Sequence, residues 1–141
     1  MYGTPGATLA EGTFPRPQVN RDYAPFYDGI QQGKLLIQKC NKCSELQHPP
    51  GPMCGHCNAI DWSMHECSGN GTLHSFTIHH YPPLAGFDTP HAIALADMEE
   101  GFRLVAGFKN VEHDAIAIGM EVRLDYPEVE PGYRLYTFVP A

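Results

Sequence analysis

The chain has 141 residues, 43% hydrophobic and 18% charged, a composition typical of a globular domain that folds without disulfide bonds. No apolar run approaches the roughly 20 residues needed to cross a bilayer, and residues 1–17 lack the basic start and apolar block of a secretory signal, so we expect no membrane partner and a cytoplasmic location. The formal net charge of −7 disfavours binding to nucleic-acid phosphates.

The first predicted elements are an arm and a short helix. Residues 1–19 contain six glycines and prolines and little to bury, which predicts a flexible or extended arm. Residues 20–33 are predicted to form a helix, with Asp22 as N-cap and Gly33 at its C-terminal end. Its aromatic face favours packing against the chain's own domain, although a docking surface for another chain is an alternative. The residues of that face follow helical spacing: Tyr23, Phe26, Tyr27 and Ile30.

Residues 34–66 are predicted to form a metal-binding ribbon. A strand over 34–40 leads into two C-x-x-C pairs separated by ten residues: Cys40, Cys43, Cys54 and Cys57. Two such turns bring four thiolates tetrahedrally around one ion, at about 2.3 Å per Zn–S bond. Because cysteine fills all four positions and leaves no coordination position open, we predict a structural metal. Zinc is the expected ion, and iron fits the same ligands.

The second cysteine pair, Cys54-Gly55-His56-Cys57, also matches the redox pair of disulfide-exchange enzymes. That chemistry needs a preceding strand and a following helix within a βαβ framework. The prolines at 49, 50 and 52 exclude the strand, and residues 58–62 show no amphipathic helix, so the redox interpretation is disfavoured. His48 and His56 are possible substitute ligands, but we expect exposed loop residues. Cys67 is expected to be a buried or half-buried free thiol at the junction with the next module.

Residues 67–141 are predicted to form a small antiparallel barrel. Alternating apolar residues between glycine and proline turns indicate four or five short strands, within 71–81, 91–98, 102–109, 119–126 and 133–139. A chain segment of this size suits the five-stranded OB-fold. The predicted fold class is therefore mainly β, with an N-terminal helix, a rubredoxin-like zinc ribbon and then a C-terminal OB-fold barrel.

The loop over residues 79–91 carries the side chains best suited to chemistry in the barrel half. A histidine beside Asp88 is able to act as a general acid or base, and three prolines stiffen the loop. We predict that the loop lines a pocket or faces a partner, and a catalytic site of a stand-alone hydrolase or hydratase is the alternative. The candidate residues are His79, His80, Tyr81, Phe87 and His91.

The order of these elements resembles a known family. The aromatic helix at 23–30 is followed by the first cysteine pair within 36–43, a His-Pro-Pro stretch at 48–50 and Trp62. After these come two segments with glycine turns, at 68–77 and 118–122, and a terminal Phe138-Val139-Pro140. Over about residues 22–140 the chain is similar to rubredoxin-like zinc-ribbon plus OB-fold proteins of the domain-of-unknown-function-thirty-five family. One departure is that the family commonly has an arginine where this chain has Gly51-Pro52-Met53.

The resemblance implies a non-catalytic accessory subunit of a thiolase-fold enzyme that makes or cleaves carbon–carbon bonds in acyl-CoA substrates. Known settings include acetoacetyl-CoA formation, steroid side-chain aldolysis, acyl transfer to phenolics and thiolysis of aryl-succinyl-CoA. The catalytic cysteine and histidines would lie on the large partner, while this chain would help to enclose the CoA chain and the acyl pocket.

Two other functions remain alternatives. A single-stranded nucleic-acid-binding OB-fold needs a basic groove, whereas residues 68–141 carry ten acidic and four basic residues. A rubredoxin-like iron electron carrier would use the same four cysteines.

Overall fold

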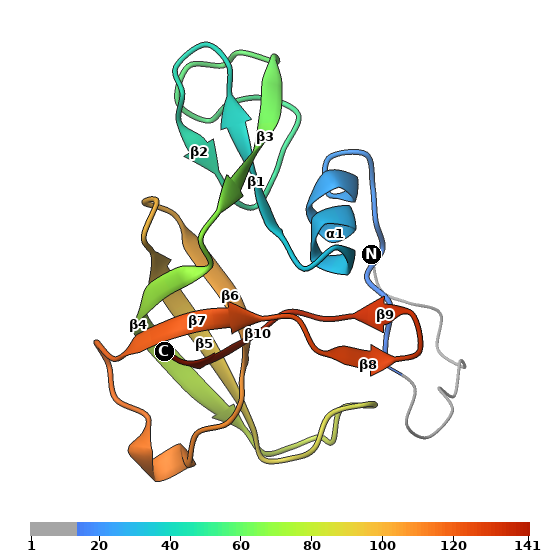
Figure 1. Cartoon of the computed structure of the whole chain (residues 1–141), viewed down its shortest axis with the longest axis vertical. Coiled ribbons are helices and arrows are strands. Elements are labelled where there is room, and N and C mark those ends of the chain that lie inside the picture. The colour runs from blue at the N-terminus through green and yellow to red at the C-terminus, as the bar shows by residue number, and fades with distance from the viewer. Residues whose placement is uncertain (1–13) are drawn as a thin grey trace.

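A computed structural model describes residues 14–141 of the chain, so residues 1–13 of the predicted arm lie outside the described part. A three-stranded sheet and a closed five-stranded barrel follow one another along the chain, and the helix packs beside them (Figure 1). A two-stranded hairpin extends from the barrel beneath the helix (Figure 1). The fold class predicted from the sequence is confirmed.

Helix α1 spans Ala24–Gln31. The predicted N-cap at Asp22 is wrong, because the cap position is Tyr23 and no side chain caps it. Instead, the side-chain oxygen of Asn20 accepts hydrogen bonds from the backbone N–H groups of Asp22 and Tyr23, each at 3.0 Å. The helix ends before Gly33, whose φ of +72° is a conformation that glycine adopts without strain. Within the described residues, no helix is long and apolar enough to span a bilayer.

The apolar face of α1 packs against its own chain, as predicted. Phe26 and Ile30 are each 1% exposed and belong to the same core as the barrel side chains. The Phe26 ring contacts the ring of Tyr136, which precedes the last barrel strand, at 5.4 Å and nearly perpendicular. The helix therefore joins the ribbon to the barrel instead of standing apart from them.

The ribbon is an antiparallel sheet in the order β2-β1-β3, formed by β1 (Leu35–Cys40), β2 (Leu46–Gln47) and β3 (Trp62–Cys67). Strand β1 pairs with β3 along its whole length, from Leu35 opposite Cys67 to Cys40 opposite Trp62. The buried amide of Gln38 donates to the carbonyl of Gly51 at 2.7 Å and accepts from its N–H at 2.9 Å. These bonds fix the proline-rich loop that carries the second cysteine pair.

The barrel closes in the order β10-β6-β5-β4-β7, with strands β4 (Asn70–His79), β5 (His91–Met98), β6 (Arg103–Phe108), β7 (Glu121–Asp125) and β10 (Thr137–Pro140). Its interior is filled by alternating residues, among them the predicted set Phe102, Leu104, Ala106 and Phe108, all of which are buried. Three alanines on β5 are also fully buried, which lets neighbouring strands close around a narrow core.

Two details of the barrel differ from the prediction. The expected last strand over 133–139 is divided: β9 (Tyr133–Arg134) pairs with β8 (Glu128–Glu130) in a separate hairpin, and only Thr137–Pro140 joins the barrel. Strand β10 also lies parallel to β6, although the prediction was purely antiparallel. A parallel pair needs a long crossover, and the connection between them contains the 3-10 turn His113–Ala115, β7 and the hairpin.

Candidate metal centre and barrel cavity

The four predicted cysteine ligands come together at the tip of the ribbon. Their sulfur atoms all lie within 4.8 Å of one another, with Sγ–Sγ distances of 3.5 Å for Cys40 and Cys57 and 3.6 Å for Cys43 and Cys54. A disulfide bond would be about 2.05 Å long. Sulfurs arranged tetrahedrally around one ion at about 2.3 Å would be about 3.8 Å apart. The observed spacing therefore fits a shared metal ion, and all five cysteines are free.

The two cysteine turns repeat one backbone geometry. In each turn, the N–H of the residue four positions after the first cysteine donates to that cysteine's carbonyl at 3.0 Å, from Ser44 to Cys40 and from Asn58 to Cys54. Ser44 and Asn58 both adopt positive φ, 65° and 62°. This conformation closes each turn directly after its second cysteine. Each turn thus supplies two sulfurs to the cluster.

Backbone amides favour the thiolate form of two ligands, Cys40 and Cys54. The N–H of Cys43 points to the Cys40 sulfur at 3.5 Å, and this bond is the main cause that lowers the pKa of Cys40 to about 6. The pKa of Cys54 is also lowered, first by the Cys57 N–H and then by the His56 N–H, which lies 3.4 Å from its sulfur. Since the thiolate is the form that coordinates a metal, these two sulfurs are prepared for a cation. Although the Glu45 amide lowers it, burial and the three neighbouring cysteines raise the pKa of Cys43 to about 12.

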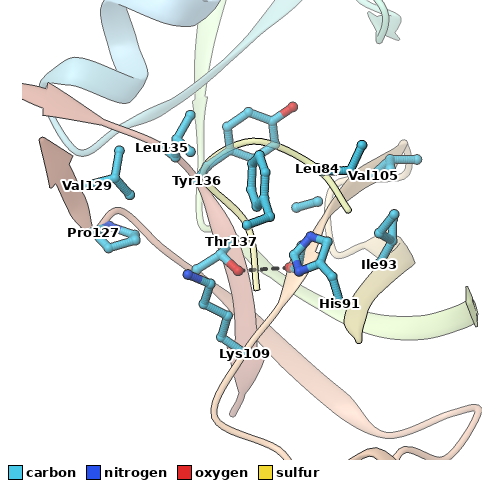
Figure 2. Close-up of a pocket in the computed structure, with 13 residues that line it drawn as sticks. Leu84, His91, Ile93, Val105, Lys109, Pro127, Val129, Leu135, Tyr136 and Thr137 are labelled. Atoms are coloured by element: carbon cyan, nitrogen blue, oxygen red, sulfur yellow. Dashed lines mark hydrogen bonds between the residues drawn. The ribbon is translucent and has the colours of Figure 1, made fainter. Parts of the chain in front are cut away.

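A second feature is a cavity of about 300 Å³ beside the barrel. It lies between strands β5 and β6, the loop after β4 and the segment that contains the β8–β9 hairpin (Figure 2). Two of the predicted loop residues, Phe87 and His91, line it, and their rings are 5.0 Å apart.

The other three predicted loop residues lie elsewhere. His79 is bound to its own loop, because its Nε2 atom lies 2.6 Å from the carbonyl oxygen of Pro82. His80 and Tyr81 are exposed, Tyr81 to 83%. Two of the five candidates line the cavity, His79 lies opposite His91 in the β4–β5 pairing, and the remaining two are exposed, so their role toward a substrate or partner stays a prediction.

Sequence reasoning missed most of the cavity wall, including Lys109, Val129, Leu135 and Thr137. Lys109 follows β6, Val129 lies in β8, and Leu135 and Thr137 lie near the end of the chain, so the fold alone brings them to the loop. One local signal was present: β5 and β6 carry Ile93 and Val105 at outward positions, where a solvent-facing strand would have polar residues.

Comparison with known proteins supports this organisation. Residues 28–59 match the family described as "ChsH2, rubredoxin-like zinc ribbon domain", and residues 64–126 match "ChsH2, C-terminal OB-fold domain". A "DUF35 domain-containing scaffold protein" of Pyrococcus furiosus is 32% identical over 109 residues, which are 76% of each chain. The chain belongs to the DUF35 family. This confirms the family resemblance stated from the sequence.

Two further relatives of this DUF35 chain bear the names of enzyme subunits. A solved structure titled "Ltp2-ChsH2(DUF35) aldolase" contains a chain that is 42% identical, with a TM-score of 0.84 over 89% of this chain and 98% of the other. A "Probable enoyl-CoA hydratase alpha subunit" of Thermomonospora curvata is 42% identical over 127 residues. The match covers 90% of this chain but only 40% of that relative, so the chain spans well under half of the curated protein's length.

The described end of the predicted arm lies against the β8–β9 hairpin of this DUF35 chain. The backbone N–H of Phe14 donates to Glu130 at 2.9 Å, and Arg16 forms an ion pair with the same carboxylate at 2.6 Å. The Arg16 guanidinium also lies 3.3 Å above the centre of the Tyr133 ring. Phe14 then contacts Phe87 edge to face at 5.3 Å. Residues 14–16 thus link the hairpin to the loop that lines the cavity.

Replacing Arg16 with alanine should release this link. Because the ion pair is partly exposed, we expect the free energy of unfolding to fall by only about 1 kcal/mol. The larger effect should be local, as faster hydrogen exchange at the Phe14 amide, measured by mass spectrometry or NMR. Arg123→Ala, at an exposed residue of β7, is the matched control and should leave that amide protected. Unchanged exchange at Phe14 in Arg16→Ala would contradict the assignment.

His48 is not the exposed loop residue predicted from the sequence. Its ring packs against Phe26 of α1 at 5.0 Å and against Phe102 of the barrel at 6.3 Å. Burial lowers its pKa from 6.5 to about 4. The prediction failed because the two aromatic contacts come from segments distant in sequence. His56 is exposed, as expected.

Acid should destabilise the protein through His48. The folded state keeps this side chain neutral down to about pH 4, whereas the unfolded chain binds the proton near pH 6.5, so acidification within this window favours unfolding. Because the side chain is partly exposed, we expect the free energy of unfolding to fall by about 1–2 kcal/mol between about pH 7 and 5. Denaturant titrations at several pH values measure it. His48→Gln should flatten the dependence, and the exposed control His80→Gln should not.

Proposed function

We propose that this DUF35 chain is a zinc-binding, non-catalytic accessory subunit of a thiolase-fold enzyme that cleaves or forms a carbon–carbon bond in an acyl-CoA. The observation that carries the proposal is the structural match, at a TM-score of 0.84, to 98% of a chain in a structure whose title names an aldolase with two components. Aldolases act on carbon–carbon bonds. The proposal that the substrate is a coenzyme A thioester is supported by the relative named as a probable enoyl-CoA hydratase alpha subunit.

Zinc is the proposed occupant of the four-cysteine cluster. The sulfur spacing supports a tetrahedral ion, and the matched ribbon family is described as a zinc ribbon. Bound zinc would supply structural cross-linking and no open coordination position, because Cys40, Cys43, Cys54 and Cys57 complete the tetrahedron. The chain's own part is to favour the thiolate form of Cys40 and Cys54 through backbone amides of the two turns. Metal analysis of purified protein distinguishes zinc from iron.

The reaction is proposed to take place on the large partner. Within the described residues, the only tight cluster of candidate metal ligands is this closed four-sulfur set. His79 lies opposite His91 in the pairing of β4 and β5, but its Nε2 atom is held 2.6 Å from the Pro82 carbonyl oxygen, and His80 is exposed. This arrangement supports a shaping role and gives no support to a stand-alone hydrolase or hydratase.

The partner is proposed to dock over the loop after β4. Three apolar residues around the cavity mouth and the loop are unusually exposed for a folded domain: Tyr81, Leu84 and Val105. Grouped exposed apolar side chains favour a protein interface. The thiolase-like large subunit would cover them, with the acyl-CoA at or near the shared boundary. Thiolysis of an aryl-succinyl-CoA and retro-aldol cleavage of a steroid side-chain acyl-CoA are the reactions we propose first.

Co-expression with the neighbouring reading frames tests the proposal. We expect a thiolase-fold protein to co-purify with this chain, and acyl-CoA cleavage to require both chains. Leu84→Asp should weaken the complex at least about tenfold, because a charge enters an apolar contact. Ile118→Asp, at an exposed apolar residue outside the loop, is the control and should bind normally. Full cleavage by the isolated chain would overturn the proposal.

A further inference from the structure

The cavity beside the barrel has the construction of a small-molecule site. Three separate segments form its walls: Ile93 and Val105 from β5 and β6, Leu84 and Phe87 from the loop, and Val129 and Leu135 from the segment around the hairpin (Figure 2). Its volume of about 300 Å³ is at the lower end of the roughly 300–1,000 Å³ typical of ligand sites. Such walls accept a compact aryl or branched alkyl group.

Three polar side chains, His91, Lys109 and Thr137, lie toward one end of the cavity (Figure 2). Leu135 and Tyr136, which carries its hydroxyl, lie toward the other end in the same view (Figure 2). The Thr137 hydroxyl donates to the Gly107 carbonyl at 2.9 Å, so it has no proton left for a ligand. Lys109 is the one permanently charged residue of the thirteen described lining residues, which include no aspartate or glutamate. This end of the cavity therefore favours an anion.

His91 stays neutral at this end of the cavity. Its pKa is lowered by burial first, and further by the positive charge of Lys109 and by His79 and His113. A neutral imidazole carries one N–H and is able to donate a hydrogen bond without adding charge. Lys109 then provides the charge and His91 a second donor.

We propose that this cavity binds a compact aryl or branched alkyl group that carries a carboxylate, with the hydrocarbon against the apolar walls and the carboxylate at Lys109. All thirteen lining residues belong to this chain, so binding is measured without the thiolase-fold partner, which is proposed to cover two of them, Leu84 and Val105. Failure of one leaves the other standing, because small-molecule binding is measured on the isolated chain and association on the complex.

The walls are held in place before any ligand arrives. A side chain at Gly107 would come within 3.2 Å of the His91 ring and 3.4 Å of the Thr137 hydroxyl, so glycine leaves room for both side chains. On the opposite side, Phe14 braces Phe87 through their edge-to-face contact. A preformed site loses less conformational entropy on binding than one that must be assembled.

Methyl NMR of the zinc-loaded full chain tests the proposal, with 3-phenylpropanoate as the anionic probe and 3-phenylpropanamide as its uncharged match. We expect saturable shifts at the methyl groups of Ile93, Val105, Val129 and Leu135, with a Kd of about 1 mM, ordinary for a probe of this size. The amide should bind about five- to tenfold more weakly. If the methyl signals of these residues do not shift at probe concentrations up to about 10 mM, or if only other residues shift, the proposed site is wrong.

Three variants separate the parts of the proposal. Lys109→Met should weaken the carboxylate about five- to tenfold and leave the amide unchanged, whereas Lys34→Met, at an exposed lysine before β1, should change neither. Val105→Trp should fill the cavity mouth and abolish binding of both probes; Val105 is 53% exposed, so the fold should tolerate it. If Lys109→Met and the unmodified chain bind the carboxylate with equal affinity, the assigned anion contact is wrong. If Val105→Trp still binds either probe, the assigned cavity is wrong.

Discussion

Replacing Cys57 with serine is expected to unfold the ribbon. Structural zinc in small modules contributes apparent binding energies of roughly 10–16 kcal/mol at neutral pH, far more than the paired strands β1 and β3 are able to replace. Zinc content should fall to near zero, and the amides of β1 and β3 should lose protection from hydrogen exchange. The barrel strands should stay protected, because their core is formed largely by β4–β7 and β10.

The matched control for this experiment is Cys67→Ala. Cys67 ends β3, where the ribbon passes into the barrel; it is buried, and its sulfur is not part of the cluster. Burial raises its pKa to about 12, so it remains a neutral thiol. The control should keep one zinc per chain. A Cys57→Ser protein with full zinc content and an unchanged melting temperature would show that the ligand assignment is wrong.

Replacing Phe26 with alanine should have the largest effect of any single change in the apolar core. Its ring contacts His48 of the ribbon loop and Tyr136 before the last strand, and it is 1% exposed. Removing a buried phenylalanine ring typically costs about 3–5 kcal/mol, so we expect the melting temperature to fall by roughly 10 °C. Calorimetry measures it. Tyr81→Ala, which removes an exposed aromatic ring, should change the melting temperature little. If both variants lower the melting temperature equally, the junction role of Phe26 is wrong.

The parts of the molecule set by local chemistry were predictable from the sequence. The four cysteines indicated the ribbon because a metal requires thiolates at fixed short spacing, whatever the rest of the chain does. Alternation in β6 indicated the barrel because Leu104 and its neighbours must share one face. The glycine after α1 indicated where the helix ends.

The parts set by distant contacts were not predictable. The aromatic neighbours of His48, Phe26 and Phe102, lie 22 and 54 positions away along the chain, so its burial left no local signal. The cavity needs the parallel pairing of β10 with β6, which brings Thr137 beside Gly107. The five loop residues looked like one cluster in the sequence, yet His79 pairs with His91 across β4 and β5 while His80 and Tyr81 are exposed.

The most direct test of the account is native mass spectrometry of this chain co-expressed with its neighbouring reading frames, with metal analysis of the same sample. We predict one species that contains this chain, a thiolase-fold subunit and one zinc per copy of this chain. A chain that stays alone and metal-free in the presence of those products, while they cleave acyl-CoA without it, would contradict the account.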